Sequence, residues 1–228
     1  MDTEALKQEA GKAACTFVQD GMKVGLGTGS TVKYTLIELG RMIQENGLEI
    51  VGVPTSTATA SLAKSLGIPL AELDEIDGLD IVIDGADEVD AQFQLIKGGG
   101  AALLREKIVA QASKQMIVVV DERKIVSTLG SFPLPIEITP FSALTTQRSI
   151  ANLLQCDTTL RMKDGNPLQT DNGNFIIDAH TGASIHDPVA VEQHLLHLAG
   201  VVQVGLFTNL CDIVIVAGQN GVNILTKA

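Results

Sequence analysis

The sequence contains few cysteines, and none of them lies at a spacing typical of a structural site. Cys15, Cys156 and Cys211 are scattered through 228 residues, are odd in number and show no metal-ligand spacing. Disulfide frameworks need paired cysteines and an oxidising compartment, so this pattern favours a reduced intracellular environment. We therefore expect a cytoplasmic protein without a disulfide framework.

Basic residues and long apolar runs are also scarce. Sixteen Lys and Arg against twenty-seven Asp and Glu give a formal net charge of −11. This balance argues against a broad nucleic-acid surface and against attraction to anionic membranes, so any phosphate site must be local. No segment approaches the roughly 20 apolar residues of a membrane-spanning helix, and no apolar stretch precedes the charged N-terminal residues. We expect neither a nucleic-acid partner nor a membrane anchor.

Helical and strand patterns alternate through the first 130 residues. The hydrophobic content of 45% is enough to bury a substantial core. Repeated strand–helix units predict a mostly parallel sheet with helices on both faces, which is a Rossmann-like α/β fold. We expect helices at 3–19, 34–43, 56–66 and 101–113 and strands at 22–25, 49–53, 79–84 and 115–120.

A change of pattern near residue 130 predicts a second domain. Residues 132–135 (FPLP) are expected to form a linker, because two prolines separated by one residue do not continue a helix or a central strand. The following segments have the βαββαβ order of a ferredoxin-like domain. We expect a Rossmann-like catalytic domain of residues 1–130 plus 207–228, with a smaller α+β domain of residues 131–206 inserted. The expected strands are 135–139, 158–163, 174–179 and 201–205, the helices 142–154 and 188–198, and the tail strands 213–217 and 222–225.

A glycine loop follows the first predicted strand. Residues 25–31 (GLGTGST) lack the third glycine of the dinucleotide fingerprint, because Ser30 takes that place, and they lack the lysine of a P-loop. The hydroxyls of Thr28, Ser30 and Thr31 are expected to face outward at the start of a helix, where N–H groups suit an anion. A loop that only caps the helix is the alternative.

Two carboxylates lie at the end of a predicted buried strand. Asp84 ends the strand, and Gly85 turns the chain so that Asp87 lies nearby. Their mutual repulsion makes one carboxylate easier to protonate, which suits proton exchange with a substrate. Mg²⁺ binding and a solvated acidic loop remain alternatives, although the spacing does not match a calcium loop.

A triple glycine follows Lys97 and opens a predicted helix. Glycines at 98–100 let the backbone approach a ligand closely, and Lys97 suits a substrate oxygen, although such a lysine is more often solvated. On a helical wheel, Glu106 lies at the fringe of the apolar arc that includes Leu103 and Ile108, so periodicity predicts a solvated glutamate. Lysine, N–H donors and carboxylates together suit a small anionic substrate that gains and loses protons.

Several motifs at consistent separations resemble type A ribose-5-phosphate isomerases over nearly the whole chain. They are residues 25–31 (GLGTGST), 84–88 (DGADE), 97–100 (KGGG), 105–107 (REK), 130–135 (GSFPLP), 170–174 (TDNGN) and 205–207 (GLF). The resemblance implies interconversion of D-ribose 5-phosphate and D-ribulose 5-phosphate in the pentose phosphate pathway, through an enediolate and without cofactor or metal. It also implies a homodimer or a homotetramer.

The resemblance assigns roles to individual residues. Glu106 matches the family's proton-transferring base, and Asp84, Asp87 and Lys97 match its other catalytic residues. The positions that match substrate-binding residues are Thr28, Gly29, Ser30, Thr31, Gly85, Ala86, Gly98, Gly99, Gly100, Lys124 and Lys7.

Two other functional classes remain open. A related fold serves CoA transferases, which use a glutamate nucleophile, and the chain also resembles sugar-phosphate sensor domains of transcriptional regulators. Such regulators carry a DNA-binding helix pair, whereas residues 1–20 supply a single acidic helix, which argues against that role.

Overall fold

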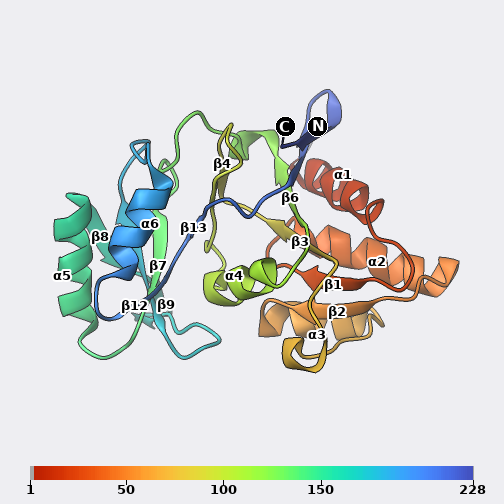
Figure 1. Cartoon of the computed structure of the whole chain (residues 1–228), viewed down its shortest axis with the longest axis horizontal. Helices are drawn as coiled ribbons and strands as arrows, with labels where there is room; N and C mark the ends of the chain where they lie inside the picture. Colours follow the sequence, from red (N-terminus) through yellow and green to blue (C-terminus); the bar gives the residue numbers. More distant parts are fainter. Residues whose placement is uncertain (1–2, 228) are drawn as a thin grey trace. The chain divides into compact units, whose positions relative to one another are not determined.

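The computed structural model describes residues 3–227 and divides the chain into two compact units. The first unit comprises Met1–Ala86, Arg105–Lys124 and Leu210–Ala228, and the second comprises Asp87–Leu104 and Ile125–Asn209. The chain therefore passes between the units four times (Figure 1). Among the described residues, no helix combines the length and the apolar character needed to cross a bilayer.

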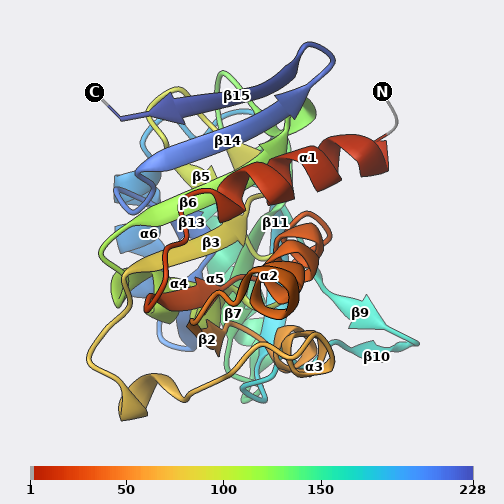
Figure 2. The same ribbon diagram turned by 90° about the vertical axis from the view of Figure 1, so that its right-hand side faces the viewer.

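The first unit is built on a six-stranded sheet with the order β15-β14-β6-β3-β1-β2. All neighbouring strands are parallel except β14 and β15, which form an antiparallel hairpin (Figure 2). This arrangement confirms the predicted mostly parallel α/β sheet. The strands are β1 (Lys23–Leu26), β2 (Val51–Pro54), β3 (Ile81–Gly85), β6 (Met116–Asp121), β14 (Ile213–Gly218) and β15 (Gly221–Thr226).

Helices cover both faces of this sheet. Apolar side chains of α1 (Thr3–Cys15) and α2 (Val32–Asn46) share one core with Val24 and Leu26 of β1. A Cβ built on Gly25 would point to the opposite face and lie 2.7 Å from Val109 in α4 (Leu103–Gln111). A short helix, α3 (Thr57–Ser65), follows β2, and 3-10 turns lie at η1 (Leu73–Glu75) and η2 (Glu122–Lys124).

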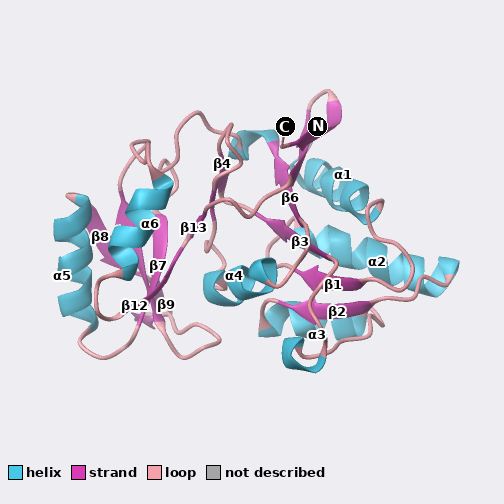
Figure 3. Cartoon of the chain, in the orientation of Figure 1, coloured by secondary structure: helices cyan, strands magenta, loops and turns pink. Residues whose placement is uncertain are grey.

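The second unit contains a four-stranded antiparallel sheet with the order β12-β7-β11-β8. With helices α5 and α6 between its strands, it has the ferredoxin-like βαββαβ arrangement that the sequence predicts (Figure 3). Ile136, Ile150 and Leu195 contribute to its core. The elements are β7 (Leu134–Ile138), α5 (Ala143–Leu154), β8 (Asp157–Leu160), β11 (Phe175–His180), α6 (Pro188–Leu196) and β12 (Val201–Val204), with a small hairpin of β9 (Met162–Lys163) and β10 (Asn166–Pro167).

The predicted strand 135–139 is confirmed one residue earlier in the chain, so the predicted linker at 132–135 is wrong in its second half. The strand β7 begins at Leu134 and is central, because it pairs with both β11 and β12. Pro135 has no N–H, but its carbonyl accepts a hydrogen bond of 2.7 Å from the Gly205 N–H. Proline is tolerated there because it lies near the beginning of the strand.

A small three-stranded sheet was not expected from the sequence. Its strands β4 (Glu88–Val89), β5 (Leu95–Ile96) and β13 (Leu206–Phe207) are two residues long, too short for an alternating pattern to reveal. Through this sheet, residues 87–104 cluster with the second unit, whereas the sequence assigns them to the first domain. The division into separately folding domains stays a prediction, and residues 1, 2 and 228 lie outside the described residues.

Candidate active site

Asp84 lies at the end of β3 with its side chain withdrawn from water. The apolar run before it makes β3 a buried central strand, and Asp84 is 0% exposed. Its Oδ1 accepts hydrogen bonds from the N–H of Thr28 at 3.0 Å and from its neighbour Gly85 at 2.7 Å. Because β1 and β3 are parallel neighbours, the loop after β1 and the end of β3 meet at one edge of the sheet.

The glycine loop 25–31 is organised differently from the sequence prediction. The Thr28 hydroxyl does not face outward but contacts the hydroxyls of Thr55, Ser56 and Thr59 at 2.8, 2.8 and 3.2 Å. Gly29 and Ser30 are exposed, and Thr31 is half-buried. Within the part of the chain described, the Thr31 side chain makes no capping hydrogen bond, so the simple capping interpretation is not supported at this residue.

The hydroxyl cluster of Thr55, Ser56 and Thr59 was missed by the sequence analysis. Ser56 is the N-cap of α3 and accepts a hydrogen bond from the Thr59 N–H, while the Thr59 hydroxyl donates to the carbonyl of Gly27 at 2.9 Å. The run of Ser and Thr at 55–59 before a helical pattern was the available signal. The cluster ties the start of α3 to the glycine loop.

Asp87 and the triple glycine lie together in the second unit. The N–H of Gly99 donates a hydrogen bond of 2.8 Å to Asp87 Oδ2, and a Cβ at position 99 would lie 2.7 Å from Oδ1 of the same carboxylate. The Ala101 N–H donates to the Gly98 carbonyl at 3.0 Å, which closes a tight turn. Gly98 has φ +109°, and a Cβ there would lie 2.7 Å from Leu103. Glycine is therefore required at both positions.

Lys97 is a buried lysine, contrary to the expectation from residue type alone. Only 2% of Lys97 is exposed, and its Nζ lies 5.3 Å from the ring centroid of Phe207. A cation over an aromatic face is stabilised by the ring quadrupole. The Lys97 N–H donates to the Gly205 carbonyl at 2.8 Å, which fixes the residue at the end of β5.

Glu106 is buried as well, and here the helical-wheel prediction is wrong. Glu106 lies in the first turn of α4 and is 3% exposed, whereas Ile108, which the wheel places in the apolar arc, is 47% exposed. The face of α4 that is withdrawn from water thus carries a carboxylate. Buried carboxylates of this kind are common at functional sites, although ion-pair networks bury them as well.

Glu88, next to Asp87, holds the segment after residue 129. Its two carboxylate oxygens accept hydrogen bonds from the N–H groups of Gly130 at 2.7 Å and Phe132 at 2.6 Å. These bonds join the 84–88 motif to the 130–135 motif. Glu88 therefore anchors the backbone beside Asp87 rather than offering a second reactive carboxylate.

The remaining binding candidates lie in the first unit. Gly85 and Ala86 are half-buried and follow Asp84 directly. Lys124 is half-buried in η2, and Lys7 is half-buried on α1, where its Nζ pairs with Glu4 at 2.8 Å. The first unit thus contains Asp84 in contact with the glycine loop, and the second contains Asp87 in contact with Gly99.

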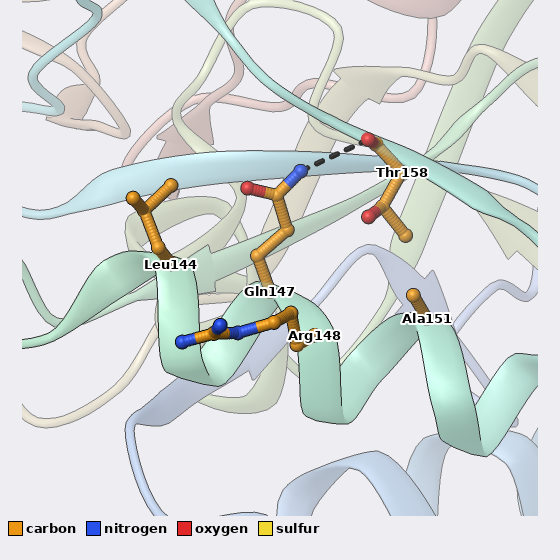
Figure 4. A pocket seen from close by; sticks show the side chains of 5 residues that line it. All are labelled: Leu144, Gln147, Arg148, Ala151 and Thr158. Atoms are coloured by element: carbon orange, nitrogen blue, oxygen red, sulfur yellow. Dashed lines mark hydrogen bonds between the residues drawn. The ribbon is translucent and has the colours of Figure 1, made fainter.

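One pocket of the second unit is lined by residues other than these candidates. A pocket of about 330 Å³ lies against α5 and β8, where Gln147 Nε2 donates to the Thr158 carbonyl at 2.9 Å (Figure 4). Within residues 3–227, no group of three or more His, Cys, Asp and Glu side chains is arranged to hold a metal ion.

Comparisons with known proteins match this chain to one family. The family model of ribose 5-phosphate isomerase A (phosphoriboisomerase A) matches residues 51–221. Ribose-5-phosphate isomerase A of Bacillus mycoides is 54% identical over 217 residues, covering 95% of this chain and 97% of the relative. The Rhodopseudomonas palustris enzyme of the same name is 50% identical over 234 residues, covering all of both chains.

Solved structures agree with this assignment. Ribose 5-phosphate isomerase A from Methanocaldococcus jannaschii has a TM-score of 0.94 and 40% identity, covering 99% of this chain and 100% of that one. A D-ribose-5-phosphate isomerase in complex with phospho-erythronic acid has a TM-score of 0.96 and 42% identity over all of both chains. Fold and motifs therefore define an isomerase of the α/β class. The chain belongs to the ribose 5-phosphate isomerase A family, which confirms the resemblance seen in its sequence.

Proposed function

We propose that this chain interconverts D-ribose 5-phosphate and D-ribulose 5-phosphate through an enediolate, with Glu106 as the proton-transferring base. The observation that carries the proposal is the burial of three charged side chains: Asp84 is 0%, Lys97 2% and Glu106 3% exposed. Withdrawing charge from water is costly, and these three residues match the family's catalytic positions, so their burial supports a role in chemistry.

The proton transfer needs one carboxylate. Glu106 removes the proton from C2 of the opened aldose and returns it to C1 of the enediolate, so that a single base serves both carbons. The start of α4 favours a charged carboxylate at this position, whereas burial disfavours charge. The proposed role as a base requires burial to offset the effect of the helix start.

The negative charge that develops on the substrate oxygen needs hydrogen-bond donors to stabilise it. Lys97 and the amides of the triple glycine supply them, and losing one such donor typically costs about 3 kcal/mol of barrier. The Gly99 N–H is bonded to Asp87, so we assign that amide to the carboxylate and the oxyanion to Lys97 with Gly98 and Gly100. Asp84 and Asp87 hold and shuttle the hydroxyl protons.

The phosphate is assigned to the exposed part of the glycine loop. Gly29, Ser30 and Thr31 precede α2, and N–H groups at a helix start favour anions. Thr28 supports the loop through its hydroxyl contacts rather than binding the phosphate with its side chain. Lys7 and Lys124 are the proposed cationic partners.

One solved relative supports the enediolate. Its structure is a complex with phospho-erythronic acid, which carries both a phosphate and a carboxylate. A carboxylate resembles the charged, planar oxygen-bearing end of an enediolate, so such a ligand resembles the intermediate more than the substrate. We propose that this chain binds the same acid in the same way.

The direct test uses purified protein treated with a chelator and then incubated with D-ribose 5-phosphate. Formation of D-ribulose 5-phosphate supports the proposal. Binding of the sugar phosphate without any ketose would instead indicate a sensor, and a covalent adduct with an acyl-CoA would indicate a CoA transferase. Cofactor independence, a homodimer or homotetramer, a cytoplasmic location and a role in the pentose phosphate pathway stay predictions.

A further inference from the structure

Arg161, which belongs to none of the family motifs and has no part in the proposed chemistry, contacts the triple glycine of residues 98–100. It follows β8, and its Nη1 donates to the carbonyl of Gly98 at 2.8 Å and to the carbonyl of Gly99 at 3.1 Å. The Gly98 carbonyl and the Gly99 N–H belong to one peptide plane and point in opposite directions in a trans peptide. Arg161 therefore holds one end of the plane whose other end donates to Asp87.

The guanidinium is itself held firmly. Its Nε and Nη2 donate to the two carboxylate oxygens of Asp178 in β11, at 2.8 and 2.5 Å. The Arg161 N–H donates to the Ile176 carbonyl at 2.8 Å, and the side chains of Arg161 and Asp178 are only 15% and 16% exposed. The bidentate pair with Asp178 fixes the orientation of the guanidinium group. Its remaining nitrogen, Nη1, donates to the carbonyls of Gly98 and Gly99.

The triple glycine is restrained by Arg161 in addition to the Ala101 N–H, which donates to the Gly98 carbonyl. Three consecutive glycines have more backbone freedom than any other tripeptide, so their peptide planes rotate easily in the absence of restraint. Rotation of the 98–99 plane would turn the Gly99 N–H away from Asp87. Rotation of the 99–100 plane would redirect the Gly100 N–H.

We propose that Arg161 is a positioning residue for the isomerase reaction: by binding the carbonyls of Gly98 and Gly99, it fixes the peptide planes whose N–H groups hold Asp87 and the substrate oxyanion. This inference rests on the proposed function. In this proposal Arg161 acts through the two peptide groups and not by contact with the substrate. Its positive charge on the carbonyl side also polarises both peptide groups and strengthens their N–H donors.

The alternative is that Arg161 only neutralises Asp178. The two roles are separated by comparing Arg161→Ala with the double variant Arg161→Ala/Asp178→Ala. Removing arginine alone leaves a carboxylate without its partner, whereas the double variant removes the pair together. If Arg161 serves only Asp178, the double variant recovers activity. If it serves the glycine carbonyls, both variants are equally slow.

We expect kcat to fall about 10- to 100-fold in both variants, because misplaced catalytic groups cost about that much. KM for ribose 5-phosphate should change less than about threefold, because an interaction made only in the transition state lowers kcat without changing KM. The matched control is Arg148→Ala, an exposed arginine of the same unit that contacts Thr145, and its kcat should stay within about twofold.

A second readout does not depend on turnover. The hydrogen exchange of the Gly99 amide, measured in the ligand-free protein by NMR, should become at least about tenfold faster in both variants, while amides of the α5 core keep their rates. This readout decides the role of Arg161 even if the starting protein makes no ribulose 5-phosphate, an outcome that would refute the proposed function instead. Unchanged Gly99 exchange, normal kcat in Arg161→Ala, or recovery of kcat in the double variant would each overturn the proposal. Should the single variant fail to fold, the double variant and its Gly99 exchange give the answer.

Discussion

The backbone N–H of Thr28 donates a hydrogen bond of 3.0 Å to the Asp84 carboxylate, although the two residues are 56 positions apart. The contact arises because β1 and β3 are parallel neighbours that end at one edge of the sheet. Gly27 makes it possible, since a Cβ at that position would overlap the carboxylate. The conformation of the glycine loop and the position of Asp84 therefore depend on each other.

Replacing Gly27 should disturb the reaction more than the fold. In Gly27→Ala, the new methyl group displaces the Asp84 carboxylate, and we expect kcat to fall about 100-fold, as misplaced catalytic groups do. Overpacking should also lower the free energy of unfolding by about 1–3 kcal/mol. Steady-state kinetics and urea unfolding measure the two effects.

The control for this variant is Gly165→Ala on the β9–β10 turn. Gly165 has φ +81° with no atom within 4 Å of a built Cβ, so the substitution strains the backbone without displacing a neighbour. It should cost about 1–2 kcal/mol of stability and leave kcat unchanged. Turnover as fast in Gly27→Ala as in Gly165→Ala would mean that the position of Asp84 is not critical.

Removing the hydroxyl should lower stability at Thr28 and ligand affinity at Thr31. Thr28→Val breaks contacts with Thr55, Ser56 and Thr59, so it should lower the free energy of unfolding by about 1–2 kcal/mol. Thr31→Val should leave stability unchanged but weaken the binding of phospho-erythronate about 10-fold, because a hydrogen bond to a charged group is lost.

Urea unfolding measures the stability of both variants, and calorimetric titration with phospho-erythronate, with unphosphorylated erythronate as the reference ligand, measures their binding. The Thr31 defect should appear only with the phosphorylated acid. An equal loss of affinity for both ligands would show that the phosphate does not bind to this loop.

Much of the fold could be predicted because it depends on local patterns, whereas the burial of charged residues could not. On the α4 wheel, Ile108 belongs to the apolar arc and Glu106 to its fringe, yet the structure exposes Ile108 and buries Glu106. Periodicity assumes that the buried face is apolar, and that assumption fails where a helix presents a functional side chain. Only the family motif identified Glu106 in advance.

Lys97 and Arg161 show two further limits of the sequence. The ring that covers Lys97 belongs to Phe207, which lies more than 100 residues later in the chain, so no local pattern predicts the burial of this lysine. Arg161 contacts Gly98 through tertiary structure alone and lies in none of the motifs. The linker prediction fails at Leu134 and Pro135, because the rule against proline in central strands has an exception at the beginning of a strand.

Asp121 should make stability depend on pH in the acidic range. Its carboxylate accepts hydrogen bonds from the Arg123 side chain at 2.8 and 3.0 Å, and these bonds hold its pKa below the usual value against the opposing effect of burial. A carboxylate with a lowered pKa in the folded state stabilises the protein fully above the unfolded pKa of about 4, and this stabilisation is lost as the pH falls through the folded pKa.

Asp121→Asn should therefore lower the free energy of unfolding at pH 7 by about 0.5–1 kcal/mol, a modest value because the Arg123 side chain is 61% exposed. The difference from the starting protein should shrink below about pH 4. Urea midpoints between pH 2 and 8, with the exposed Asp74→Asn as control, measure it. A deficit that stays constant over the whole range would show that the hydrogen bonds do not depend on the charge of Asp121.

The most direct measurement is the fate of the migrating hydrogen when ribose 5-phosphate is converted in heavy water. With the starting protein and with Glu45→Gln, which changes an exposed glutamate on α2, mass spectrometry should find solvent deuterium at the exchanging carbon of the sugar. Glu106→Gln should bind the substrate with nearly unchanged affinity but lose both turnover and deuterium uptake, by about a thousandfold or more. Near-normal turnover in Glu106→Gln, or conversion by the starting protein with no deuterium taken up under any condition, would show that Glu106 does not carry the proton between C2 and C1.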